Sequence, residues 1–479
     1  MPYALGIDLG TARTVAAVSH NRRDSWSEPE VVPLDAASDL PGVASVLYLT
    51  SDDAVEVGEA AIRAGAANPD RVARDFLDRI GDEVPLALGD TYYPAETLAA
   101  ALVAWVVDRV EDHEGTPATQ VVVTHPVGWG VHRRTVFQSA MRDLNLPELT
   151  MLPRPVAAAE AYAATERLEI GQEIAVYSLG ASRFEAAVLR RGSFGFELRA
   201  HADSVDVLGG DLFDDLVAEH AAADLGELPE DPAAIAALRA ACVDAKERLS
   251  TAVAVTIPTP AHSKKATVLL NRSAFDDMIR PAIEHTVRIL QRAITGTGTE
   301  TDALNAVVLV GGCAHVPLIT ELVMAAVRLL VVAAPDPTTA IARGAALAGG
   351  RVAKPTVRAE PAVTPTVTPT ESVSAHTDLM RFDDMDAEVA DIGPPPPRPP
   401  VEIPALDPPP RGLARLTRRS RGGAEVDELD RDQRSWEFEE DDRADKRDRD
   451  KDKRQDDIDE PAPRRRRKPD RFEDDEDDE

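Results

Sequence analysis

The first apolar run of the sequence contains a carboxylate, Asp8, shortly before the turn residues Gly10 and Thr11. A buried carboxylate is costly unless it is paired or lies near a metal ion. Backbone N–H groups in tight turns bind phosphate oxygens, and small residues let the backbone approach a ligand closely. Asp8 is therefore a candidate contact for a nucleotide or a metal ion, and the alternative is a carboxylate that only caps a turn.

A second group of small residues, Gly311 and Gly312, follows the apolar run at 306–310. On its own this pair is a tight turn as readily as a nucleoside contact. The two cysteines, Cys242 and Cys313, fit no metal-binding or CxxC spacing, which excludes a disulfide framework and suits a reducing compartment. We interpret His125 and His315 as ordinary core or loop histidines.

The elements that position these residues follow a repeated pattern. Strands are predicted at 3–9 and 14–18 around the first turn, and again at 173–178 and 184–191 around the small-residue turn 179–182. Strand, turn and strand differ from the strand, turn and helix of a P-loop. The recurrence predicts two similar α/β lobes, about 1–172 and 173–350, with a ligand cleft between them.

Helices and further strands complete both lobes. Helices are predicted at 95–110, 133–144, 155–167, 212–225, 233–250, 274–294, from 317 onward and at 338–348. Additional strands are predicted at 120–124, 253–258, 265–270 and 306–310. Ser273 is predicted to cap the helix that follows it.

The composition limits the partners of this chain. The sequence has 53 Lys+Arg and 84 Asp+Glu, a net charge of −31, which excludes nucleic acid and anionic membranes as partners of the folded part. No apolar run reaches the ~18 residues of a membrane span. The start, MPYALGIDLG, has no basic region like that of a signal peptide. We therefore expect a cytoplasmic protein.

The composition changes near residue 350. We predict a disordered Pro/Thr-rich linker at 351–424 and a disordered, charged polyampholyte tail at 425–479, because neither buries enough apolar surface to offset its ordering entropy. The proline run at 393–412 is either a linker or a docking peptide. The basic cluster at 464–468 is flanked by carboxylates, so the tail either keeps the chain soluble or contacts acidic partners.

Seven segments, in order along residues 3–350, share their pattern with one known family. They include GIDLGTARTVAAV (6–18), VYSLGASRFEAAVLRRG (176–192), VLGGDLFDDLVAEH (207–220), ACVDAKERLS (241–250) and VVLVGGCAHVPLITELV (307–323). The chain thereby resembles the nucleotide-binding domain of the 70-kDa heat-shock chaperone family, in the actin/sugar-kinase superfamily. The resemblance implies an actin-like ATPase fold with two similar lobes around a nucleotide cleft. No segment resembles the family's substrate-binding half.

The resemblance also implies cofactors and site residues. ATP and Mg²⁺ would bind in the cleft, with Asp8 holding Mg²⁺ through water. Nucleotide contacts are implied at Asp8, Gly10, Thr11, Gly180, Gly209, Gly210, Lys246, Ser250, Gly311 and Gly312.

The catalytic positions of the family are substituted in this sequence. The Glu that polarises the attacking water aligns with Arg154, the phosphate-facing Lys with Leu77, the metal-side Asp with Ser178, and the final Asp with Thr338. Arg154 and Arg183 are candidates to supply positive charge to a nucleotide phosphate. Positive charge at these positions favours nucleotide binding without hydrolysis.

Two functions follow as hypotheses. The first is a chaperone-like protein that binds ATP–Mg²⁺, hydrolyses it weakly or not at all, and couples cleft motion to a protein partner. The alternative is a non-hydrolysing pseudo-ATPase scaffold whose tail recruits protein partners, for example at secretion or envelope assembly. A sugar kinase is disfavoured because no sugar-pocket pattern is present. A monomer is expected, since one chain forms the whole cleft.

Overall fold

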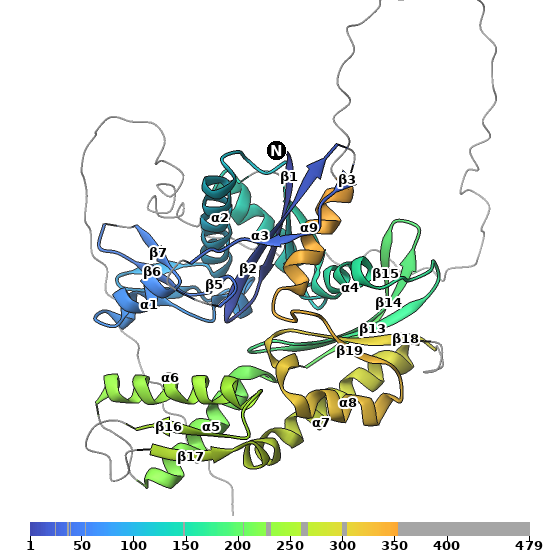
Figure 1. Ribbon diagram of the computed structural model, residues 1–479. Helices are drawn as coiled ribbons and strands as arrows, with labels where there is room; N and C mark the ends of the chain where they lie inside the picture. The colour runs from blue at the N-terminus through green and yellow to red at the C-terminus, as the bar shows by residue number, and fades with distance from the viewer. Residues whose placement is uncertain are drawn as a thin grey trace, which may run out of the picture. The chain divides into compact units, whose positions relative to one another are not determined.

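The computed structural model describes residues 1–352, except for residues 24, 36–37, 39, 53, 147–148, 205, 227–230, 260–266 and 299–303. Two sheets with matching strand arrangements organise this part of the chain (Figure 1). Apart from residues 351 and 352, the predicted linker and the charged tail lie outside the described residues, so both remain predictions.

The first sheet has the strand order β12-β11-β1-β2-β3, with β4 and β5 paired to β2. Its strands are β1 (Tyr3–Leu9), β2 (Arg13–Arg22), β3 (Ser25–Trp26), β4 (Glu30–Val31), β5 (Val43–Ala44), β11 (Gln120–His125) and β12 (Leu149–Pro153). β1 is antiparallel to β2, with Asp8 opposite Val15, and parallel to β11. The first predicted hairpin is therefore present, with a longer second strand.

The second sheet has the order β15-β14-β13-β18-β19 and repeats this arrangement. Its strands are β13 (Glu173–Leu179), β14 (Phe184–Gly192), β15 (Gly195–Asp203), β18 (Leu304–Val310) and β19 (Val331–Ala333). β13 is antiparallel to β14, with Ser178 opposite Glu185, and parallel to β18. The predicted duplication thus extends to the pairing partners of each hairpin.

The helices pack on and between these sheets. They are α1 (Glu59–Gly65), α2 (Ala95–Glu114), α3 (Val131–Asp143), α4 (Arg154–Thr165), α5 (Gly210–Leu225), α6 (Pro232–Leu249), α7 (Arg272–Gly296), α8 (Pro317–Val327) and α9 (Ala340–Val352). Although α9 follows the second sheet in sequence, it packs on α4, β1, β2 and β11 (orange in Figure 1). The end of the predicted second lobe therefore packs on the first sheet.

Glycines make this return of α9 possible. A Cβ atom on Gly6 would lie 2.3 Å from the backbone N of Ala346 and 2.4 Å from the carbonyl O of Ala342. A Cβ atom on Gly344 would lie 1.7 Å from the carbonyl O of Ala157 in α4. The helix thus contacts its neighbours backbone to backbone, a distance that only glycine allows.

Short elements add an outer part to each lobe. In the first lobe they are β6 (Leu47–Leu49), β7 (Val55–Val57), β8 (Val72–Ala73), β9 (Leu86–Leu88), β10 (Thr91–Tyr93), η1 (Pro69–Arg71) and η2 (Phe76–Arg79). In the second lobe β16 (Ala254–Pro258) and β17 (Thr267–Asn271) form a two-stranded sheet near α6 (Figure 1). The short 3₁₀ helix η4 (Gly312–His315) follows β18.

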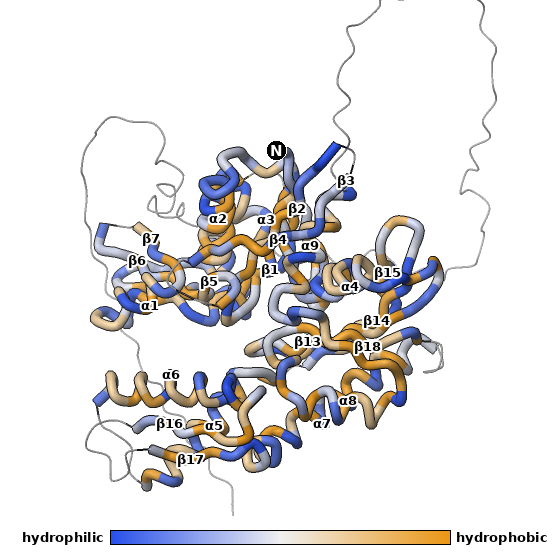
Figure 2. The backbone as a smooth tube through the Cα atoms, viewed as in Figure 1, coloured by the Kyte–Doolittle hydropathy of each residue, from blue (hydrophilic) through white to orange (hydrophobic). Residues whose placement is uncertain are grey.

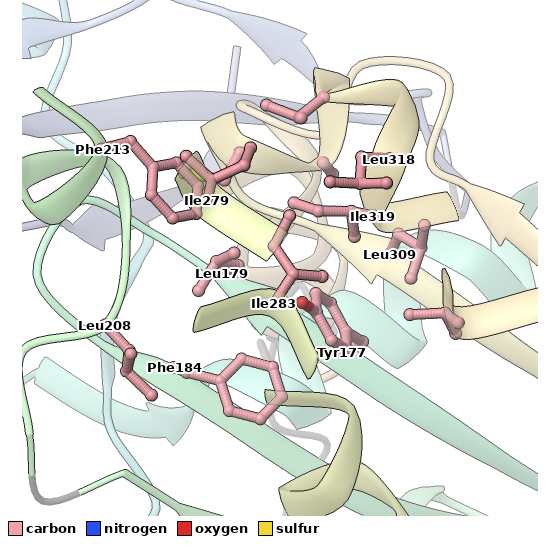
Figure 3. Packing of buried hydrophobic residues seen from close by; sticks show 14 of the residues in the cluster. Tyr177, Leu179, Phe184, Leu208, Phe213, Ile279, Ile283, Leu309, Leu318 and Ile319 are labelled. Carbon is pink, nitrogen blue, oxygen red and sulfur yellow. The ribbon is translucent and has the colours of Figure 1, made fainter. Parts of the chain in front are cut away.

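The interior is built mainly from Ala, Val, Leu and Ile, as the low aromatic content predicts; Figure 2 shows the hydrophobic residues along α2 and β18. The second core, shown in Figure 3, surrounds Tyr177 and Phe184, whose ring centroids are 4.6 Å apart. The buried Tyr177 hydroxyl forms a hydrogen bond of 2.6 Å with Thr286 Oγ1. A third cluster joins residues of both sheets, including Val122 and Val176, through α4 and α9.

One predicted cap is wrong. Asn271 is the residue before α7, no side chain caps the helix, and Ser273 lies inside its first turn. The reason is that the chain passes directly from the last residue of β17 into the helix, which therefore begins at Arg272. Among the helices that the structure describes, none is both long and apolar enough to cross a bilayer.

Candidate functional site

A cleft of about 720 Å³ lies where the turns of the two hairpins meet. Its walls come from both lobes: the β1–β2 turn and the start of α4 on one side, and the β13–β14 turn, α5, α6 and η4 on the other. The Oγ atoms of Thr11 and Ser182 are 3.0 Å apart, so a hydrogen bond joins the two turns directly.

The structure brings nearly all of the predicted contact residues to this cleft. Those that line it are Asp8, Gly10, Thr11, Gly180, Gly210, Lys246, Ser250, Gly311 and Gly312. Gly209 is not among the lining residues, and its role is close packing: a Cβ atom there would lie 2.3 Å from the carbonyl O of Ala181. His315 lines the cleft as well.

Asp8 at the first turn is held by two neighbours. Its Oδ1 accepts a hydrogen bond from Thr124 Oγ1 at 2.7 Å and lies 3.4 Å from Arg154 Nε. Arg154 also donates from Nη2 to the carbonyl O of Leu9. The side chains of Asp8 and Arg154 are only 13% and 16% exposed. A guanidinium group therefore stands beside the carboxylate that the resemblance assigns to Mg²⁺.

The second turn has its carboxylate on the other strand. Ser178 is 8% exposed, and the residue opposite it, Glu185, accepts a hydrogen bond from the Val127 backbone N–H at 2.7 Å. Burial raises the pKa of Glu185 to about 7, and the negative charges of Asp203 and Asp8 act in the same direction. Glu185 lines the cleft, and the sequence interpretation missed it. The feature of the sequence that could have identified Glu185 is a carboxylate among the apolar residues of its strand.

At the rim of the cleft, Arg183 Nε lies 2.5 Å from Asp78 Oδ1, so the second turn is tied to η2 of the first lobe. Leu77, which aligns with the family's phosphate-facing Lys, is 6% exposed and belongs to the first core. In η2 the polar contact at the rim is therefore made by Asp78, the residue that follows Leu77.

Lys246 marks the opposite side of the cleft. Its Nζ donates to Asp214 Oδ2 at 2.9 Å and to the Gly210 carbonyl at 3.4 Å. Burial raises the pKa of Asp214, although the positive charge of Lys246 opposes this rise. Lys246 of α6 is therefore already paired with Asp214 of α5 at the wall of the cleft.

The turn after β18 requires glycine. Gly311 has φ 91°, and a Cβ atom there would lie 2.4 Å from the Leu179 carbonyl O. Cys313 donates from Sγ to the Gly180 carbonyl at 3.3 Å, and burial raises the pKa of its thiol to about 12. The thiol is therefore protonated at neutral pH and serves as a packing group.

Thr338 donates from Oγ1 to Asp336 Oδ1 at 2.5 Å, and both residues line the cleft. Burial acts to raise the pKa of Asp336, but hydrogen bonds from Thr338 and Thr339 outweigh it and lower that pKa. A carboxylate thus lies two residues before the position that aligns with the family's final Asp.

The donors around Asp8 do not suit a magnesium ion. Mg²⁺ is usually held by one or two carboxylates and its own waters. Oδ1 of Asp8 already contacts Thr124 and Arg154, and the aligned position on the second turn carries the hydroxyl of Ser178. A cation at this place would lie next to a guanidinium group, whose charge opposes it.

The fold and the cleft define the class of protein. Two lobes with matching sheets, each carrying a strand hairpin whose turn faces a common cleft, are the actin-like ATPase fold. The model of the family described as Hsp70 protein matches residues 83–390, which is more than half of the 479-residue chain. The chain belongs to the Hsp70 family, which supports a chaperone-like nucleotide-binding role. The predicted family and fold class are thus confirmed.

Proposed function

We propose that this protein binds ATP in the cleft between its lobes and hydrolyses it slowly or not at all. The observation that carries the proposal is the position of Arg154 in the cleft, beside Asp8, where the family has the Glu that polarises water. A cationic guanidinium group attracts phosphate but cannot accept a proton from water.

The walls of the cleft support binding. The two turns carry backbone N–H groups of the kind that bind phosphate oxygens, although the N–H groups of Gly10 and Gly180 themselves donate to carbonyls within their turns. The hydroxyl of Thr11 accepts a hydrogen bond from Ser182 across the two turns. Gly311 and Ser250 line the side that the resemblance assigns to the nucleoside. These small residues leave room for a ligand while the surrounding sheets and helices hold the turns in place.

The scaffold without turnover is the second candidate, and one observation favours it. Three cations of the cleft each have a carboxylate partner within the chain: Arg154 with Asp8, Arg183 with Asp78, and Lys246 with Asp214. The cleft can therefore balance much of its charge without a ligand. In this function the two lobes form a fixed platform, and protein partners bind elsewhere, including at the predicted tail.

Thermal unfolding of the full chain with and without millimolar ATP tests binding. A ligand that binds only the native state raises the melting temperature. We expect a rise, and its absence under all metal conditions would favour the empty scaffold. A phosphate-release assay tests turnover: we expect release close to the background rate. Robust release that Asp8→Ala abolishes would contradict slow hydrolysis.

A further inference from the structure

Arg154 lines the cleft and has a buried donor without a hydrogen-bond acceptor. Its Nη2 donates to the Leu9 carbonyl, but its buried Nε finds no hydrogen-bond acceptor among the described residues, although Asp8 Oδ1 is 3.4 Å away. An N–H group that is buried without an acceptor is costly. If the guanidinium group turns from Asp8 toward the cleft, an acceptor on a ligand would remove that cost.

Two other cations that line the cleft, Arg183 and Lys246, differ from Arg154 in this respect. Arg183 Nε is 2.5 Å from Asp78 Oδ1, and Lys246 Nζ is 2.9 Å from Asp214 Oδ2. Both therefore donate to their carboxylates in full hydrogen bonds, whereas the Arg154–Asp8 pair is longer. Of these three cations, Arg154 is therefore the one whose charged group keeps a donor without a hydrogen-bond acceptor.

The guanidinium group of Arg154 indicates which class of ligand would bind here. Guanidinium groups present planar N–H donors that match two oxygens of a phosphate group, and charge-assisted hydrogen bonds of this kind are strong. Divalent metal usually neutralises the phosphates of a bound nucleotide, but the donors at Asp8 do not suit Mg²⁺. A positive charge fixed to the protein can perform the same neutralisation.

We propose that Arg154 replaces the divalent cation in this cleft, so that the ligand is a nucleoside di- or triphosphate free of metal. The inference rests on the proposed nucleotide-binding function. On binding, the guanidinium of Arg154 contacts the phosphates from the side of α4, and the turn at Gly10 and Thr11 contacts them with backbone N–H groups. Asp8 then competes with the ligand for Arg154, in contrast to the metal-holding role that the resemblance implies.

Calorimetric titration of the full-length protein with ATP, in EDTA and separately in excess Mg²⁺, tests this inference. We expect binding in EDTA to be at least as tight as binding in Mg²⁺. Binding that requires Mg²⁺ would overturn the inference and leave the proposed function standing. Absence of binding in both conditions would overturn the proposed function itself.

Variants then assign the effect to Arg154. Arg154→Gln should weaken binding in EDTA at least about tenfold, the scale of a lost charge-assisted hydrogen bond. Arg142→Gln removes the same charge from an exposed position on α3 and should leave the affinity unchanged. Equal affinities for Arg154→Gln and the wild type in EDTA would contradict the role of Arg154.

Asp8→Asn keeps the test decisive if the Arg154 variant does not fold. Because the amide no longer competes for the guanidinium, binding of metal-free ATP should strengthen by a few fold. A carboxylate that holds Mg²⁺ through water instead predicts that Asp8→Asn loses binding when Mg²⁺ is present. Weaker binding of ATP in EDTA by Asp8→Asn would therefore overturn the inference.

Discussion

The two central hairpins have equivalent strands but carry their carboxylates on opposite sides of the ladder. In the first hairpin Asp8 on β1 faces Val15 on β2, whereas in the second Ser178 on β13 faces Glu185 on β14. Asp8 lies beside a cation, while Glu185 is held by a backbone N–H group. The same backbone thus supports two different charge arrangements, which decide what each turn can offer a phosphate.

The strands also differ in how closely a helix approaches. Gly6 on β1 contacts the backbone of α9, whereas Val176, at the equivalent place on β13, is a fully buried side chain. Gly6→Val should lower the free energy of unfolding by about 4 kcal/mol, because the new atoms meet backbone that cannot move aside. Val176→Ala should cost only about 2 kcal/mol through lost burial. Denaturant unfolding measures both.

Gly130 provides the control for that prediction, because a Cβ atom there meets nothing within 4 Å. Gly130→Ala should change stability by less than about 1 kcal/mol. If Gly6→Val were as mild as this control, the close approach of α9 to β1 would not matter for stability.

Glu185 makes the second hairpin sensitive to pH. Its pKa rises from 4.5 to about 7 on folding, so the folded state binds the proton more tightly and stability falls as the pH rises between these values. The fall amounts to about 3 kcal/mol at most. Glu185→Gln should remove this contribution, so the variant gains stability relative to the wild type from pH 5 to pH 8. Denaturant unfolding across that range provides the measurement.

The gain of Glu185→Gln over the wild type should grow with pH. A gain that stays constant between pH 5 and pH 8 would show that Glu185 does not titrate there.

The ion pairs of the two turns should differ in strength. The Arg154–Asp8 pair is largely buried, so a double-mutant cycle with Arg154→Gln and Asp8→Asn should give a coupling free energy of about 1.5 kcal/mol. The Arg183–Asp78 pair lies at the rim, with side chains 39% and 26% exposed, and its cycle should give about 0.5 kcal/mol. High salt should reduce the second coupling more. Equal couplings would remove this distinction between the turns.

Much of the fold could be predicted from the sequence because its signals are local. Apolar runs and turn residues located both hairpins, and the periodic segments located the long helices to within a few residues. The short strands of the outer part of the first lobe and the exposed strand β15 were not predicted. Their residues carry weak patterns, and neighbouring strands stabilise them. The cap at Ser273 failed because the preceding strand, not a cap, determines where α7 begins.

The sequence by itself determined the family, the two-lobed architecture and the group of residues that meet at the cleft. Only the tertiary structure decided how their side chains are used. Arg154 is distant from Asp8 in sequence and reaches it because β12, β11 and β1 are neighbours in one sheet. An aligned position fixes where a residue stands in the chain, but pairing, burial and orientation depend on which elements pack beside it. Leu77 lies in the core, and Glu185 in the cleft, for that reason.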